Sequence, residues 1–141
     1  MNNMTRSEAL VFLAAGTRTG KLATVRPDGR PHAVPVWFVV DAEDLVFNTW
    51  HTSVKARNLG ADPRASLVAD YQEPPYGYVM AEGAVELIDD LDEVHRIATI
   101  IGARYMGDDR AEEFGARNGV AGELAVRLRI ERFVGHDDVA G

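Results

Sequence analysis

The sequence predicts a mainly β (α+β) domain, in which about six antiparallel strands form a small barrel with helices packed on it. Short segments rich in Val and aromatic residues alternate with turn-forming residues, which is typical of strands joined by tight turns. The turns between the first three strands are too short for the crossovers that parallel strands require, so an antiparallel meander is indicated. A barrel also removes the unpaired edges that a lone sheet would expose.

The predicted elements follow in order along the chain. Thr5 and Glu8 have the spacing of a capping box, which predicts the start of a helix. Pro27-Asp28-Gly29 predicts a tight turn after the first strand, because Pro fixes φ and Gly allows a positive φ. The strands are expected at residues 20–26, 31–40, 45–50, 64–71, 76–87 and 124–133. The helices are expected at residues 5–15, 54–60, 91–105 and 109–116.

Two further predictions concern the shape of one strand and the side-chain orientation of another. Gly83 predicts a kink in the fifth strand, since a glycine inside a strand often marks a bulge. The last strand alternates apolar and charged residues, and successive side chains of a strand point to opposite faces. Val126 and Leu128 are therefore expected to face inward, whereas Arg127 and Arg129 are expected to face outward.

The 141 residues fit one domain, residues 1–141, with the helix at 5–15 followed by the barrel at 20–133. The absence of cysteine excludes a disulfide framework, a thiolate zinc site and a cysteine nucleophile. The N-terminus lacks the basic and apolar regions of a signal peptide, and the longest apolar run, Ala33–Val40, is far shorter than a membrane span. A cytoplasmic protein is therefore expected.

The charged residues are unevenly distributed. The formal net charge of −7 disfavours broad binding to nucleic acid or to an anionic membrane, so neither partner is expected. Residues 1–64 carry eight Lys and Arg against six Asp and Glu, whereas residues 65–141 carry seven against sixteen. The first part is thus weakly basic, and it contains Lys55 and Arg57.

One segment has the composition of an anion site. The HExxH, P-loop and GxGxxG motifs are absent, and neither a metal site nor a catalytic side chain is predicted. Thr52, Ser53, Lys55 and Arg57, however, stand where a predicted strand runs into a helix. Free N–H groups, hydroxyls and two cations would bind an anion there. A capped surface helix with solvated cations is the alternative interpretation.

The strand expected at 31–40 contains an unusual proline. Pro35 has no N–H for a strand ladder, so it is expected at a sheet edge or a bulge. Trp37 and Phe38 would then point to opposite faces of the sheet. One of them could pack in the core while the other lines a groove, or both could be core or interface residues.

Four segments together carry a resemblance that covers residues 10–133. They are KLATVRPDGRPHAVPVWF (Lys21–Phe38), VKARNLGADPRASL (Val54–Leu67), YVMAEGAVEL (Tyr78–Leu87) and ARYMG (Ala103–Gly107). Their order and spacing resemble the pyridoxamine 5′-phosphate oxidase-like family of FMN-binding split β-barrels. The branch they resemble is that of the short F420 (deazaflavin)-dependent oxidoreductases. This resemblance implies a split barrel that forms a homodimer with cofactor sites at the subunit interface.

The resemblance also implies roles for individual residues. The wall beside the flat ring system of the cofactor would comprise Pro35, Val36, Trp37, Asn48, Thr49 and Trp50. The cofactor phosphate would be held by Thr52, Ser53, Lys55 and Asn58, with Arg57 nearby. Tyr76 and Tyr78 would come from the partner subunit.

The activity that the resemblance implies is hydride transfer from reduced F420 to a conjugated small-molecule acceptor. The cofactor carries this chemistry, while the protein orients it and excludes water. Two alternatives remain open: an FMN-dependent oxidoreductase of the same fold, and a non-enzymatic carrier of flavin, deazaflavin or haem. A nucleic-acid-binding barrel would need a basic groove, which the acidic second part of the chain disfavours.

Overall fold

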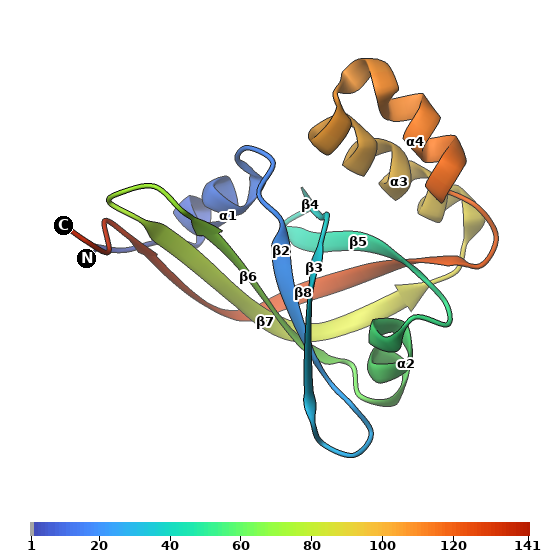
Figure 1. Cartoon of the computed structure of the whole chain (residues 1–141), viewed down its shortest axis with the longest axis horizontal. Coiled ribbons are helices and arrows are strands. Elements are labelled where there is room, and N and C mark those ends of the chain that lie inside the picture. The colour runs from blue at the N-terminus through green and yellow to red at the C-terminus, as the bar shows by residue number, and fades with distance from the viewer. Residues whose placement is uncertain (1) are drawn as a thin grey trace.

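A computed structural model of the chain describes residues 2–141 (Figure 1). These residues form eight strands: β1 (Asn2–Asn3), β2 (Gly20–Val25), β3 (Pro31–Val36), β4 (Val39–Asp41), β5 (Asp44–Trp50), β6 (Arg64–Tyr71), β7 (Gly77–Ile88) and β8 (Glu123–Asp137). The α-helices are α1 (Arg6–Ala14), α2 (Val54–Ala61), α3 (Leu91–Met106) and α4 (Ala111–Asn118), and a 3₁₀ turn, Asp108–Arg110, joins α3 to α4.

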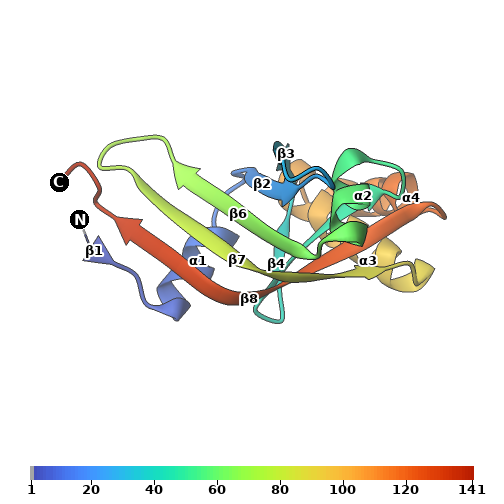
Figure 2. The same ribbon diagram turned by 90° about the horizontal axis from the view of Figure 1, so that it is seen from below.

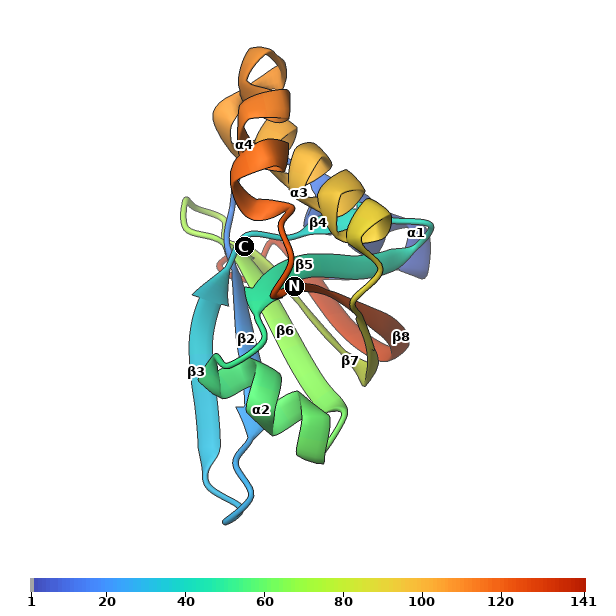
Figure 3. The same ribbon diagram turned by 90° about the vertical axis from the view of Figure 1, so that its right-hand side faces the viewer.

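The strands form one antiparallel sheet in the order β3-β2-β6-β7-β8-β5-β4, with β1 paired to the far end of β8. Its two edge strands, β3 and β4, are neighbours in the chain and are joined only by Trp37 and Phe38. The sheet therefore curls until its edges meet at this corner, where no ladder between β3 and β4 closes it within residues 2–141 (Figures 1 and 3). This is a split β-barrel, and the predicted mainly β (α+β) fold class with flanking helices is confirmed.

The prediction of one continuous strand over residues 31–40 was wrong, because this segment forms two strands, β3 and β4. Pro35 cannot donate to a ladder, and side chains of α3 bind the backbone of Phe38 in place of a neighbouring strand. The N–H of Phe38 donates to Tyr105 Oη (3.1 Å), and Arg104 donates to the carbonyl oxygen of Phe38. With the short β1 added, the six expected strands become eight.

The kink expected at Gly83 is confirmed as a bulge. The register of β7 against β8 shifts between Glu82 and Gly83. A Cβ at position 83 would lie 2.0 Å from the carbonyl oxygen of Arg129, so only glycine allows the two strands to approach this closely. β8 also runs beyond the expected end at residue 133, and its last residues pair with β7 and β1.

The core lies inside the curled sheet, and the helices complete it. Leu22, Phe47 and Leu67 are fully buried there, together with apolar residues of α1. A second cluster, which includes Val46 and Ile97, lies between α3 and the β4-β5-β8 side of the sheet. Figure 2 shows β6, β7 and β8 running from the end that carries both termini toward the end beside α3. In Figure 3, α2 lies on the opposite side of the barrel from the α3–α4 hairpin.

Local signals account for the helix starts. The Thr5 hydroxyl accepts from the N–H of Glu8 (3.2 Å), and the Glu8 carboxylate accepts from the N–H of Thr5 (2.9 Å), which confirms the capping box. Ser53 similarly caps α2. No helix within residues 2–141 is both long enough and apolar enough to cross a membrane.

Candidate functional site

The turn between β5 and α2 brings together the residues expected to bind an anion. Ser53 Oγ accepts a hydrogen bond from the N–H of Ala56 (3.1 Å), which fixes the start of α2. The same hydroxyl lies 2.7 Å from Oγ1 of Thr49, which is buried near the end of β5. The N–H groups of Val54 and Lys55, in the first turn of α2, have no acceptor within the helix and can therefore bind a ligand.

The Lys55 side chain is half-buried beside this turn. Burial lowers the pKa of Lys55, and the negative charge of Glu123 acts in the opposite direction. Burial likewise raises the pKa of Glu123, and the charge of Lys55 opposes that shift. No carboxylate oxygen of residues 2–141 lies within 4.0 Å of the Lys55 ammonium. A cation that is partly desolvated and has no close partner can gain from binding an anion.

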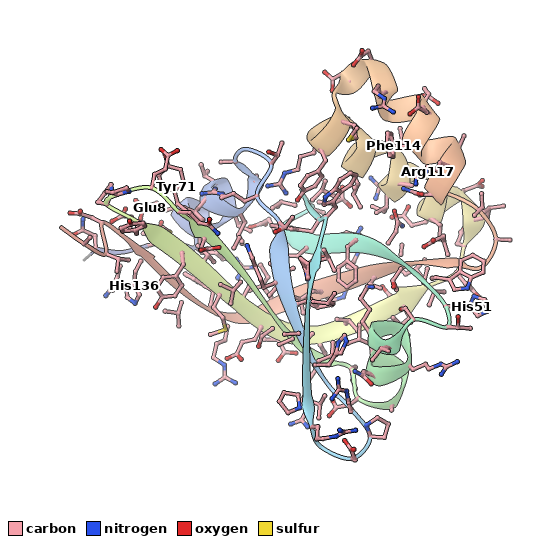
Figure 4. All side chains as sticks on the ribbon, in the orientation of Figure 1. Glu8, His51, Tyr71, Phe114, Arg117 and His136 are labelled. Carbon is pink, nitrogen blue, oxygen red and sulfur yellow. The ribbon has the colours of Figure 1, made fainter. Side chains whose placement is uncertain are left out.

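An exposed tryptophan borders the turn. Trp50, at the end of β5, is 45% exposed, and its ring lies 4.9 Å from the ring of His51. The indole packs against Gly122, where a Cβ would come within 2.3 Å of a ring carbon. His51 binds the same loop, since its Nδ1 and its N–H both lie 2.9 Å from the carbonyl oxygen of Gly122. Figure 4 shows His51 beyond the end of β5, next to α2.

Trp37 and Phe38 form the corner between β3 and β4, and they differ in exposure. Phe38 is fully buried in the core, whereas Trp37 is 39% exposed. The Trp37 indole stacks on Tyr105, with 4.9 Å between ring centroids and 5° between ring planes, and it lies 6.2 Å from the ring of Phe114. Phe114 belongs to α4 (Figure 4), so Trp37 lies against the α3–α4 hairpin.

Two residues of α3 hold this corner, and sequence reasoning assigned them no role. Tyr105 Oη lies 2.9 Å from the carbonyl oxygen of Arg18 and 3.2 Å from that of Phe38. Burial raises the pKa of Tyr105, which keeps this hydroxyl protonated. Arg104 donates to the carbonyl oxygens of Leu13 and Phe38. Both residues are part of the ARYMG segment, but a sequence pattern does not show which distant backbone atoms they reach.

Other members of the expected set differ in exposure. Asn58 is 2% exposed, and its amide donates to Thr24 Oγ1 (3.0 Å), which braces α2 against β2. Asn48 is half-buried, and its amide donates to the carbonyl oxygen of Leu124 (3.5 Å). Val36 is buried, whereas Pro35, Thr52 and Arg57 are exposed.

Tyr76 and Tyr78 lie far from Lys55 in the folded chain. The Tyr78 ring lies 5.6 Å from the ring of His136. Figure 4 shows His136 at the opposite end of the molecule from His51, which adjoins the β5–α2 turn. A single chain therefore does not bring these two tyrosines to Lys55.

The Lys55 turn is open surface on a single chain. One groove, of about 390 Å³, lies where β2 and β6 diverge and is lined in part by Thr24, Ser66 and Glu82. Another, of about 270 Å³, is lined by residues that include Tyr76 and Tyr78. Neither groove includes the β5–α2 turn. Within residues 2–141, no three His, Asp or Glu side chains are grouped so as to hold a metal ion.

A family model described as pyridoxamine 5′-phosphate oxidase matches residues 7–136. The chain belongs to this family. The resemblance drawn from the sequence is thereby confirmed at the level of the family, whose fold and residue order account for the split barrel found here.

Solved structures share the same fold. A conserved hypothetical protein of Mycobacterium tuberculosis, Rv2991, is 28% identical with a TM-score of 0.84, and the match covers 96% of this chain and 86% of that chain. An F420 reductase is 27% identical with a TM-score of 0.68, covering 86% of this chain and 93% of that chain. A haem-binding protein of Mycobacterium smegmatis, at 21% identity and a TM-score of 0.67, shares the fold over 99% of this chain and 61% of its own.

Proposed function

We propose that this protein is an oxidoreductase that uses reduced F420 to reduce a conjugated small molecule. The observation that carries the proposal is the half-buried Lys55 ammonium at the start of α2, beside the exposed ring of Trp50. A phosphate at this turn would leave a ring system attached to it free to lie along the exposed tryptophans. The similarity to an F420 reductase, which extends over 93% of that chain, supports the choice of cofactor.

The donors at the turn suit a phosphate. The free N–H groups of Val54 and Lys55 and the hydroxyl of Thr52 can donate to its oxygens, and Lys55 supplies a charge-assisted hydrogen bond. Arg57 adds a second cation on the exposed side of α2. The net charge of −7 does not prevent this, because the field that a bound group experiences is set mainly by nearby charges.

The wall of the site is fixed before any ligand binds. Tyr105 stacks on Trp37, and its hydroxyl is held by the backbone of Arg18 and Phe38. Trp37 therefore presents a preset surface, which lowers the entropic cost of orienting a flat ligand. When bound, F420 supplies the hydride chemistry, with its C5 carbon as donor. The role that we assign to the protein residues is to bind, to orient and to exclude water.

A second copy of the chain would complete the site. Val68, Met80 and Val134 lie in one row across β6, β7 and β8, and Val134 is 38% exposed. On the same face, the ion pairs Lys21–Asp70 (3.1 Å) and Arg132–Glu82 (2.8 Å) flank this row. An apolar row flanked by both charge signs can pair with its own copy around a twofold axis.

This arrangement gives Tyr76 and Tyr78 a role. They are remote from Lys55 within one chain, and their groove is open to solvent. In a homodimer, the tyrosines of one subunit would cover the open Lys55 turn of the other. The homodimer is therefore part of the proposal, since the site is incomplete without it.

The experiment that tests this function is a titration of cofactor-free protein with F420, FMN and haem, with the mass of the same sample measured by sedimentation. We expect a dimer that binds F420 with micromolar or tighter affinity. Mixing the reduced complex with quinones, unsaturated lipids or linear tetrapyrroles should then reoxidise F420 at a rate that depends on the acceptor.

Each other outcome selects a different conclusion. Preference for FMN over F420 would support the FMN-dependent alternative of the same fold. Tight binding, with the reduced cofactor stable toward every acceptor, would support a non-enzymatic carrier. Binding of none of the three would overturn the oxidoreductase proposal, and a monomeric complex with full activity would overturn the shared site.

A further inference from the structure

Glu123 stands beside the proposed phosphate site but belongs to neither the phosphate-binding set nor the ring wall. It is the first residue of β8 and pairs with Trp50, the last residue of β5. The loop before it is fixed by His51, which binds the carbonyl oxygen of Gly122 through its Nδ1 and its N–H. The N–H of Glu123 itself donates to the carbonyl oxygen of Val120 (3.0 Å). The backbone of Glu123 is thus held next to the start of α2.

The charge of Glu123 is not neutralised by a close partner. Among residues 2–141, no Lys, Arg or His nitrogen lies within 4.0 Å of its carboxylate oxygens, although the side chain is half-buried. Titratable groups of the adjoining turn and helix include His51, Lys55 and Arg57, and Asp89 and Asp90 follow β7 where its last residue, Ile88, pairs with Ala125. Lys55 and Glu123 influence each other without forming a closed ion pair. An anion bound to Lys55 would therefore face a negative charge as well as a positive one.

The energetic consequence depends on the charge of the phosphate. A phosphomonoester such as that of FMN is close to doubly negative at neutral pH, because its second pKa is about 6. The phosphate of F420 is a diester and carries a single negative charge. Both are attracted by Lys55, but the additional charge of the monoester is repelled by Glu123 in a partly desolvated place where Coulomb interactions are strong.

We propose that Glu123 makes the Lys55 site selective for a singly charged phosphodiester over a doubly charged phosphomonoester, and so for F420 over FMN. This inference rests on the proposed function, since it names the residue that distinguishes the two cofactors at the same site. Glu123 acts as a specificity-determining residue through its charge, with no contact to the reacting atoms.

The test compares three ligands on the wild type and on Glu123→Gln, a substitution that removes the charge and preserves the shape. Dissociation constants are measured for F420, for FMN and for riboflavin, which has the ring system of FMN without a phosphate. Glu112→Gln, the same change at an exposed position of α4, is the matched control. Glu123→Ala provides a second variant, and thermal unfolding verifies that each variant is folded.

We expect Glu123→Gln to tighten the binding of FMN about fivefold to tenfold more than that of F420, with riboflavin and the Glu112→Gln control unchanged. An unchanged ratio of FMN to F420 affinity in both Glu123 variants would overturn the inference and leave the proposed function intact. Equal tightening of riboflavin would also overturn it, because that result would mean a change of shape. Failure of the wild type to bind any of the three would overturn the proposed function itself.

Discussion

Two groups of charged side chains, toward opposite ends of β5, differ in how their charges are arranged. The first, the Arg127 cluster, comprises Asp41, Asp44, Glu93, Arg96 and Arg127. Arg127 donates to Asp41 (2.6 Å) and to Asp44 (3.0 Å), while Arg96 donates to Asp41 (2.9 Å) and to Glu93 (2.7 Å). The second, the Lys55 turn, has two half-buried opposite charges, Lys55 and Glu123, with no ion pair between them.

This difference in pairing distinguishes charges that stabilise the fold from charges that remain available to bind a ligand. The Arg127 cluster ties α3 to the β4–β5 hairpin, and the Arg127 side chain is only 11% exposed. Every formal charge in the cluster has a close partner of opposite sign. At the Lys55 turn, the Lys55 ammonium is partly desolvated and has no close partner. Binding of an anion there can therefore supply the interaction that the ammonium lacks in the free protein.

The largest expected effect is on the Arg127 cluster. Arg127→Ala should lower the free energy of unfolding by about 3–5 kcal/mol, because it removes the closest partner of the Asp44 carboxylate and one of the two guanidinium partners of Asp41. Urea denaturation measures the change. Arg129→Ala is the matched control on the same strand: this side chain is 63% exposed, and its loss should cost less than about 1 kcal/mol. Equal effects of the two substitutions would show that the cluster contributes no more than surface charge.

The next effect is on ligand binding at the Lys55 turn. Lys55→Ala should weaken F420 binding by about 1.5–3 kcal/mol, which is the loss of a charge-assisted hydrogen bond. The free energy of unfolding should hardly change, since Lys55 has no close partner in the folded chain. Isothermal titration and urea denaturation give the two values, with Arg129→Ala again as control. An unchanged dissociation constant would remove Lys55 from the site, and a large loss of stability would break the comparison.

The smallest effect is a difference in acid stability. Hydrogen bonds from Arg96 and Arg127 lower the pKa of Asp41 from 3.8 to about 2. The folded protein therefore binds fewer protons here than the unfolded chain. The stability contributed by Asp41 is complete above about pH 4 and is lost as the pH falls through about 2. With solvent screening, this contribution is about 1 kcal/mol.

Asp41→Asn should accordingly flatten the fall in stability between pH 4 and pH 2, as measured by urea denaturation across that range. Glu123 should give a pH dependence of stability with the opposite sign, because burial raises its pKa. In the folded state its carboxylate binds a proton more readily, so its ionisation costs stability as the pH rises through its folded pKa. Glu123→Gln should therefore leave the acid slope of Asp41 in place. The same acid slope in Asp41→Asn and in the wild type would contradict the assignment to Asp41.

The features that sequence reasoning predicted well depend on residues close together in the chain. The Thr5–Glu8 capping box, the Ser53 cap and the bulge at Gly83 each follow from one short segment. The amphipathic period of α3 and the alternation in β8 are likewise local patterns. The proline at position 35 correctly indicated a sheet edge, since β3 is the outermost strand.

The features that sequence reasoning missed depend on contacts between distant segments. The alternation of β8 places Arg127 on the outward face, but its ion pairs there with Asp41 and Asp44 of the β4–β5 hairpin could not be read from that pattern. The division of the 31–40 strand likewise depends on Tyr105 and Arg104 of α3. Glu123 was not singled out because its position opposite Trp50 exists only once β5 and β8 have paired.

The sequence by itself determined the element types, most turns, the family and the set of residues around Lys55, because propensity, capping and motif order are written in contiguous residues. Only the tertiary structure decided which charges are paired and which are free. It also decided that Asn58 is turned inward and that Tyr76 and Tyr78 lie far from Lys55 within one chain. Pairing and burial depend on side chains that meet only after the sheet has curled, and a linear pattern carries no record of those distances.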